Sequence, residues 1–215
     1  MELTLDLFKL AAIQFAADFA TRSIRELFGV TDGKAVGTWL EREFNQFLAI
    51  PYQYARGNAA SGIDFPALEV DVKVTSIRQP QSSCPFQSAS QKIYGLGYHL
   101  LIFIYEKVDD TLTQTAHLQF LHVLFIEKTR TADYQTTRGL LEILKRDGNA
   151  DDVEAFLVER NLPLDEIGRQ QLTQQILRQP PNQGVLTISN ALQWRLQYGR
   201  AIELSGREVG VEKLR

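Results

Sequence analysis

Residues 98–107 (YHLLIFIYEK) form a nearly continuous apolar run, and this run constrains the fold of the 215-residue chain more than any other segment. A strand with one solvent-exposed face alternates apolar and polar residues, whereas an unbroken apolar run is typical of a central strand that is buried on both faces. The sequence therefore predicts a sheet with helices packed on its two sides.

The segments around this run supply the expected helices and further strands, because their apolar residues recur at helical or alternating spacing. The predicted elements are helices at 5–28 and 36–49, strands at 68–75, 98–107 and 118–126, a short helix at 89–95, a mostly helical stretch from residue 134 that is broken near Gly148, Pro163 and Pro180, a strand at 185–188 and a final helix at 190–204. This order, with helices before and after a group of strands, predicts an α/β fold around one sheet.

The composition is that of an ordinary globular protein, with 44% hydrophobic and 23% charged residues and a net charge of −3. This apolar content excludes a disordered chain. No apolar stretch approaches the roughly 20 residues that cross a bilayer, and no basic segment of a secretory signal begins the chain. The single cysteine, Cys84, excludes internal disulfides and cysteine-based zinc sites. We therefore expect a cytoplasmic protein that has no contact with a membrane.

Ionisable side chains line one face of the strand predicted at residues 68–75. Glu69, Asp71 and Lys73 lie at positions i, i+2 and i+4, so their side chains project to the same side of the strand. Upstream, a glycine allows a turn that delivers Asp64 just before the strand begins. A tight hairpin through Pro66 would bring Asp64 to Asp71.

Two carboxylates that converge on one point repel each other unless a cation lies between them. Their hard oxygen ligands suit Mg²⁺, and a lysine two residues beyond Asp71 could orient a water molecule and help to deprotonate it. If the hairpin at Pro66 does not form, Glu69 could replace Asp64 or Asp71 as a ligand.

At these residues the sequence resembles the PD-(D/E)XK nuclease superfamily, which includes many type II restriction endonucleases. The first acid of the motif corresponds to Asp64, and its (D/E)-X-K element corresponds to Asp71, Val72 and Lys73, whereas Ile63 occupies the place of the motif's proline. The same element also occurs at residues 32–34, where no strand pattern surrounds it.

The resemblance implies a restriction-endonuclease-like core, with a central mixed β-sheet flanked by helices, in a single domain that covers residues 1–215. The core would occupy about residues 34–130 and a mainly helical C-terminal part about residues 131–215. The family often carries a glutamate on a helix before the catalytic strand. Glu41 matches that position because it shares a helix stripe with Gly37, and Glu43 is the competing candidate.

The resemblance also implies a metal-dependent endonuclease that hydrolyses phosphodiester bonds in duplex DNA, as a homodimer that matches a palindromic site. Mg²⁺ would be held by Asp64, Asp71 and the Val72 carbonyl, with Mn²⁺ able to substitute. Lys73 would position the attacking water, and Glu41 would bind through water. The alternatives are a structure-specific or repair nuclease of the same fold and a non-catalytic DNA-binding module.

The segment that follows the predicted catalytic strand is dense in amide and hydroxyl groups, which can bond base edges or phosphates. Gln91 and Lys92 resemble polar residues that many members of the family place near the scissile phosphate. The candidate DNA contacts are Arg78, Gln79, Gln81, Ser82, Ser83, Gln91 and Lys92.

The three histidines show no metal-ligand spacing, and we expect Trp39 and Trp194 to pack within helices.

Overall fold

The apolar run at residues 98–107 lies in β3 (His99–Asp110), a strand in the middle of a four-stranded sheet. The computed structural model describes residues 1–55, 57, 62–84, 87–189 and 194–215. The strand order is β1-β3-β4-β7, and β1 is parallel to β3 while the other two pairs are antiparallel, so the sheet is mixed. The other strands are β1 (Val70–Ser76), β4 (Thr115–Ile126) and β7 (Val211–Lys213).

Each face of β3 packs against a different layer, which explains why its apolar run is nearly continuous. Phe103 points to one face and lies 5.7 Å from Phe15 of α1 (Leu5–Phe19) and 5.2 Å from Phe44 of α2 (Gly33–Ala49), measured between ring centroids. The alternate residues of β3 belong to a second buried cluster on the opposite face. The expected mixed sheet flanked by helices is confirmed.

That opposite face is covered by a small second sheet and a short helix. The second sheet has the order β2-β6-β5 with antiparallel pairing, and α7 follows β6 along the chain. These elements are β2 (Gln81–Cys84), β5 (Thr187–Ile188), β6 (Trp194–Gln197) and α7 (Gly199–Leu204).

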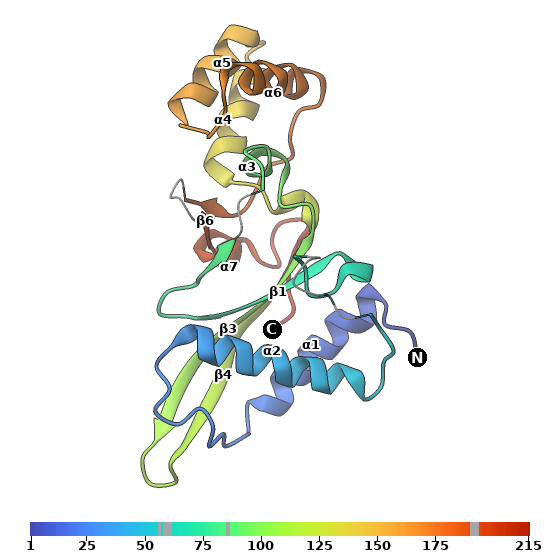
Figure 1. The fold of residues 1–215 in the computed structure, drawn as a ribbon, viewed down its shortest axis with the longest axis vertical. Coiled ribbons are helices and arrows are strands. Elements are labelled where there is room, and N and C mark those ends of the chain that lie inside the picture. The colour runs from blue at the N-terminus through green and yellow to red at the C-terminus, as the bar shows by residue number, and fades with distance from the viewer. Residues whose placement is uncertain (56, 58–61, 85–86, 190–193) are drawn as a thin grey trace.

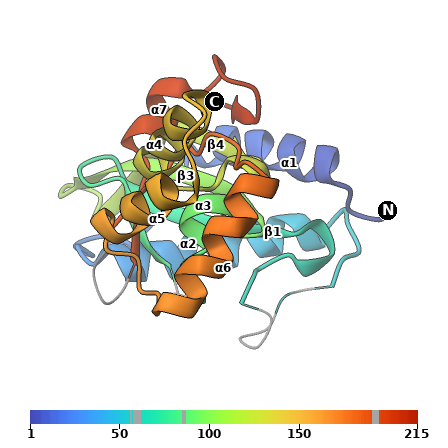
Figure 2. The same ribbon diagram turned by 90° about the horizontal axis from the view of Figure 1, so that it is seen from above.

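Three helices form the end of the molecule opposite the turn between β3 and β4 (Figure 1). They are α4 (Tyr134–Lys145), α5 (Ala150–Glu159) and α6 (Glu166–Arg178), and they share a third buried cluster with α3 (Gln91–Tyr94). Seen from above, α2 and α6 lie on the side of the molecule away from α1 (Figure 2). None of the helices in the described ranges is long and apolar enough to cross a membrane.

The helix predicted at residues 5–28 is wrong in its second half, because α1 ends at Phe19. Ile24 instead pairs with Ala116 of β4 through two backbone hydrogen bonds, of 2.9 and 2.8 Å. Its side chain is buried, so the apolar residue that favoured a longer helix reaches the core from an extended segment. A tertiary backbone pairing has here overridden the local helical pattern.

Two further expectations near the second sheet are wrong. The segment at 78–90, predicted as a loop, contains β2, and the final helix predicted at 190–204 is replaced in its described part by β6 and α7. Trp194, expected in a helix, lies in β6, where buried residues alternate with exposed ones. The sequence also gave no prediction of β7. Short strands of this kind form through non-local pairing, for which a local pattern provides little signal.

Candidate active site

A tight turn places Asp64 beside the first strand of the sheet. Phe65 and Val70 pair through two backbone hydrogen bonds of 2.9 and 3.1 Å, and a single 3₁₀ turn, Pro66–Leu68, connects them. One Asp64 carboxylate oxygen accepts a hydrogen bond of 2.8 Å from the Val72 backbone N–H. The short spacing between Asp64 and β1 is therefore compatible with a hairpin, as the sequence suggested.

Glu69 does not share the face of Asp71 and Lys73, because β1 begins only at Val70. Its backbone adopts a left-handed conformation (φ 52°) that closes the turn, and its carboxylate forms a 2.5 Å ion pair with Lys128. The hydrogen bond and charge of Lys128 lower the pKa of Glu69. The predicted row of three ionisable groups is therefore wrong at this residue, and Glu69 is engaged with Lys128.

Asp71 and Lys73 form a buried ion pair in β1, with 2.7 Å between the Lys73 Nζ and an Asp71 carboxylate oxygen. Asp71 is only 4% exposed. Its pKa is raised to about 7, mainly by burial and also by the charge of Asp64, against the opposing effect of Lys73. Burial alone would lower the pKa of Lys73, but the nearby carboxylates outweigh burial and raise it, so Lys73 stays an ammonium group.

Glu41 faces this pair from α2. Gly37, one turn earlier, lies where the helix contacts the sheet, and a Cβ at this position would lie 3.8 Å from the Val74 Cβ, an ordinary van der Waals distance. Burial raises the pKa of Glu41 to about 7, and the negative charge of Asp64 raises it as well. Glu43 instead forms a 3.3 Å ion pair with Arg42. Glu41 is therefore the candidate glutamate that faces the site, since the charges of Asp64, Asp71 and Lys73 all act on its pKa.

This group of charges is unbalanced, with three carboxylates around one ammonium group. A divalent cation would relieve their mutual repulsion, and their oxygen atoms are the donors that Mg²⁺ prefers. Within the described ranges, no three side chains of the His, Cys, Asp and Glu types are close enough to hold a metal ion by themselves. The residues present fit a cation held by two aspartates and a backbone carbonyl, with Glu41 farther out.

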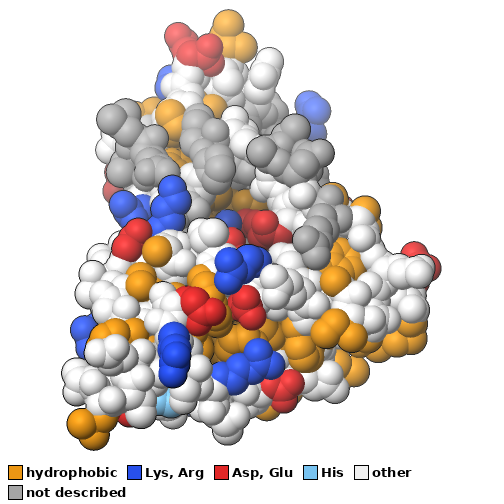
Figure 3. Space-filling model, turned by 60° about the horizontal axis from the view of Figure 1, so that its bottom comes forward, with side chains coloured by type: hydrophobic (Ala, Val, Ile, Leu, Met, Phe, Trp, Pro, Cys, Tyr) orange, Lys and Arg blue, Asp and Glu red, His pale blue; other side chains and the backbone are white. Residues whose placement is uncertain are grey.

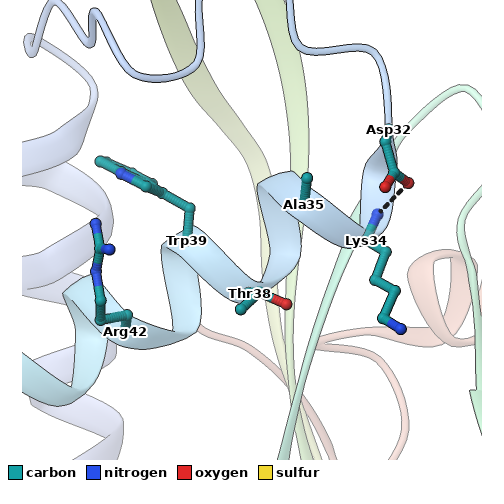
Figure 4. Close-up of a pocket in the computed structure, with 6 residues that line it drawn as sticks. All are labelled: Asp32, Lys34, Ala35, Thr38, Trp39 and Arg42. Atoms are coloured by element: carbon teal, nitrogen blue, oxygen red, sulfur yellow. Dashed lines mark hydrogen bonds between the residues drawn. The ribbon is translucent and has the colours of Figure 1, made fainter.

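The outward face of α2 has no part in this group (Figure 4). This face borders a shallow hollow, which is lined by Asp32, Lys34, Ala35, Thr38, Trp39 and Arg42. Asp32 caps the helix, because its side chain accepts a 2.9 Å hydrogen bond from the Lys34 backbone N–H. The second (D/E)-X-K match, at residues 32–34, is thus a helix cap.

The predicted DNA contacts before α3 lie in the turn after β1 and on β2. Arg78, Gln79 and Ser83 are exposed, whereas Gln81 and Ser82 are half-buried. The Thr75 hydroxyl fixes the turn through hydrogen bonds to the backbone of residues 79 and 81. The accessible side chains therefore project from a well-defined turn that follows the strand of Asp71 and Lys73.

The two predicted contacts on α3 are buried instead. The Gln91 amide donates a 3.3 Å hydrogen bond to the Leu96 carbonyl, and Lys92 is only 3% exposed. Burial lowers the pKa of Lys92, although the charge of Asp133 opposes this effect. The Lys92 Nζ lies 5.7 Å from the ring centroid of Trp194. The structure therefore holds Gln91 and Lys92 within the interior.

Tyr198 is a neighbour of the site that the sequence did not suggest. It is fully buried, and its hydroxyl forms a hydrogen bond with the Ser82 hydroxyl. Burial raises its pKa, and the negative charge of Asp71 adds to this effect. No sequence signal marks Tyr198, because only the pairing of β2 with β6 brings it near β1.

Two sequence comparisons match nearly the whole chain. The family model described as type II restriction enzyme NspV matches residues 2–213. The type II restriction enzyme NspV of Nostoc sp. is 56% identical over 209 residues, which cover 97% of this chain and 95% of that protein. Among solved structures, the chain is similar to the tetrameric restriction endonuclease SfiI bound to cognate DNA, with a TM-score of 0.39, 11% identity, and coverage of 99% of this chain and 86% of that chain.

Proposed function

The chain belongs to the NspV family of type II restriction enzymes, and we propose that it is a Mg²⁺-dependent endonuclease of the PD-(D/E)XK superfamily that cleaves duplex DNA at a specific sequence. The observation that carries this proposal is the group formed by Asp64, Asp71, Lys73 and Glu41. The charge of Asp64 adds to burial in raising the pKa of both Glu41 and Asp71, and these carboxyl groups beside a lysine held as an ammonium group suit the hydrolysis of a phosphodiester.

The metal would be held by Asp64, Asp71 and the Val72 carbonyl. Bound Mg²⁺ supplies Lewis-acid polarisation of a phosphate oxygen and lowers the pKa of an attacking water. The hydrogen bond from the Val72 N–H orients one Asp64 oxygen, which leaves the second oxygen for the cation. Glu41, farther from the pair, would accept hydrogen bonds from water bound near the cation.

Lys73 would act as a fixed positive charge in this reaction. Its ion pair with Asp71 holds the ammonium group in place before the substrate binds. From there it can donate a hydrogen bond to the attacking water and stabilise the negative charge that develops on the phosphate. Because its pKa is raised, Lys73 is a poor candidate for the general base.

DNA binding would rely on local contacts and not on a generally basic surface. Acidic and basic side chains are intermixed on the face drawn in Figure 3, in keeping with the net charge of −3. Arg78, Gln79 and Ser83 are the exposed candidates beside the site. We propose that the enzyme acts in the cytoplasm as a homodimer, whose two-fold symmetry would match a palindromic site.

Digestion of a long unmethylated duplex of known sequence tests this proposal. With Mg²⁺ we expect discrete fragments that carry 5′-phosphate and 3′-hydroxyl ends, and in EDTA we expect none. Products that depend on DNA ends or branches would instead indicate a repair nuclease. Discrete fragments formed equally in EDTA would contradict the proposed metal dependence.

A further inference from the structure

The exposed face of α6 is lined by amide side chains and has almost no charge. Gln170, Gln171, Gln174 and Gln175 are all exposed there, together with Arg178 and the helix-capping residue Gln179. A helix face that only meets solvent usually carries charged residues of both signs. Glu166 and Ile167, in the first turn of α6, are also exposed, but from Gln170 to Gln179 this face has no carboxylate and Arg178 is its one ionisable group.

The orientation of this face is fixed by packing on the other side of the helix. Leu172, Thr173 and Ile176 are buried, and the leucine and isoleucine share a cluster with residues of α4 and α5. With 3.6 residues per turn, this places Gln171, Gln174 and Arg178 at the centre of the outward face. Within the described ranges, none of the glutamine side chains on this face forms a hydrogen bond.

The C-terminal end of α6 is tied to the body of the enzyme. The Tyr94 hydroxyl, at the end of α3, donates a 3.0 Å hydrogen bond to the Gln179 carbonyl. Seen from above, α6 and α2, the helix of Glu41, lie on the same side of the molecule, away from α1 (Figure 2), whereas along the long axis α6 lies at one end and α2 toward the other (Figure 1). A rigidly mounted helix on this side could meet the same duplex as the catalytic group.

We propose that the outward face of α6 reads base edges in the major groove of DNA, with Gln171, Gln174, Gln175 and Arg178 as specificity-determining residues. Glutamine can form two hydrogen bonds to adenine and arginine two to guanine, and an α-helix fits the major groove. The helix is about 20 Å long at 1.5 Å per residue, which is enough to follow the groove over several base pairs. This inference rests on the proposed function, which supplies the duplex DNA substrate.

The test compares binding to the cleaved sequence with binding to a scrambled duplex of equal length. Measured in a Lys73→Ala background that leaves the DNA intact, the paired substitution Gln171→Ala and Gln174→Ala should reduce the preference for the cleaved sequence about ten- to a hundred-fold. Affinity for the scrambled duplex should change by less than about two-fold, because phosphate contacts remain. Gln14→Ala, at an exposed glutamine of α1, is the matched control and should leave the preference unchanged.

Modified bases test the contact directly. Replacing the recognised adenine by 7-deazaadenine removes the N7 acceptor, so it should weaken binding by the original protein but have little further effect on the variant that lacks its glutamine partner. This lack of additivity would not arise from general damage to the fold. Circular dichroism should show that the variants melt as the parent protein does.

Three results would overturn the inference. The preference could stay unchanged, both affinities could fall by the same factor, or dimer formation could be lost while the preference remains. The last result would assign this face to contact between two copies of the chain. In each case the wild-type protein would still cut DNA in Mg²⁺, which distinguishes this failure from a failure of the proposed function.

Discussion

Glu41 holds its proton more tightly than an exposed glutamate, because burial and the charge of Asp64 both disfavour its ionised form. Asp71 has a similarly raised pKa, although Lys73 lies beside it. At the scale of single residues, the site therefore holds charges that are unfavourable in the protein alone. These charges lower the stability of the folded protein, and a loss of stability of this kind is typical of a site whose function requires the charges.

The first prediction concerns the stability of Glu41→Gln. The pKa of Glu41 is about 7 in the folded state against an ordinary 4.5, so the folded state binds more protons than the unfolded state between these values. Stability of the natural protein should therefore fall as pH rises through that window, whereas glutamine cannot ionise. Without divalent metal at about pH 8, the variant should be more stable by about 1 kcal/mol, or about 2–4 °C in Tm. A thermal melting series from low to high pH measures this difference, and a constant difference across the series would contradict the account.

The second prediction separates Asp64 from Glu69. Asp64→Ala should reduce the DNA cleavage rate by about a hundred- to a thousand-fold, because it removes a proposed metal ligand. Glu69→Ala removes an exposed ion pair with Lys128 and should leave the rate within about two-fold. Equal losses in the two variants, measured under single-turnover conditions, would show that the turn matters only as a scaffold.

At the scale of elements, the close contact of α2 with β1 is what presents Glu41 to the aspartates. Gly37 lies at this contact, and an added Cβ would meet Val74 at ordinary van der Waals distance. Alanine therefore fits without displacing the helix, whereas a larger side chain would have to push α2 away from β1.

The third prediction uses this difference. Gly37→Ala should raise the free energy of unfolding by up to about 1 kcal/mol, because alanine is the better helix former, and cleavage should continue. Gly37→Leu should destabilise the fold by about 1–3 kcal/mol and lower the cleavage rate by displacing Glu41. Denaturant unfolding and cleavage assays measure both effects. If Gly37→Leu cleaved DNA at the natural rate, the position of α2 would not matter for the reaction.

The elements that the sequence predicted are those with a strong local pattern. The apolar run of β3 and the amphipathic α2 both form where expected, and the Asp71-Val72-Lys73 element lies on a strand beside Asp64. The misses share a physical cause, since β2, β6 and β7 exist only through pairing with distant segments. The predicted start of the first strand, at residue 68, was also wrong. The alternation of apolar and polar residues continues through Glu69, so it gives no sign of the left-handed turn there.

At the scale of the whole molecule, the site joins segments from different layers. Glu41 lies on a helix that covers one face of the sheet, and Asp71 lies in a strand of that sheet. On the opposite face, Tyr198 lies between β6 and α7 and bonds Ser82 of β2. A cation that neutralises the central carboxylates should therefore stabilise the entire fold and not one element alone.

The fourth prediction is that Mg²⁺ raises the melting temperature of the protein. The gain should be larger at about pH 8 than at about pH 6, because carboxyl groups with a pKa of about 7 must lose their protons to bind metal. At a hundred times its Kd the metal would contribute about 2.7 kcal/mol. Asp71→Asn should lose this gain. An equal rise in Tm in the variant would show that Mg²⁺ binds elsewhere.

The central claim is that Lys73, held by Asp71 in β1, supplies the positive charge required for cleavage. The most direct test is the single-turnover cleavage rate of Lys73→Ala at saturating Mg²⁺, with Lys107→Ala as the matched control. Lys107 also pairs with an aspartate two residues away on a strand, but its partner is Asp109 of β3 and not a carboxylate of the site. We predict that Lys73→Ala loses about a thousand-fold in rate or more while Lys107→Ala stays within about two-fold of the natural protein. Comparable rates in the two variants would contradict the assignment of the active site.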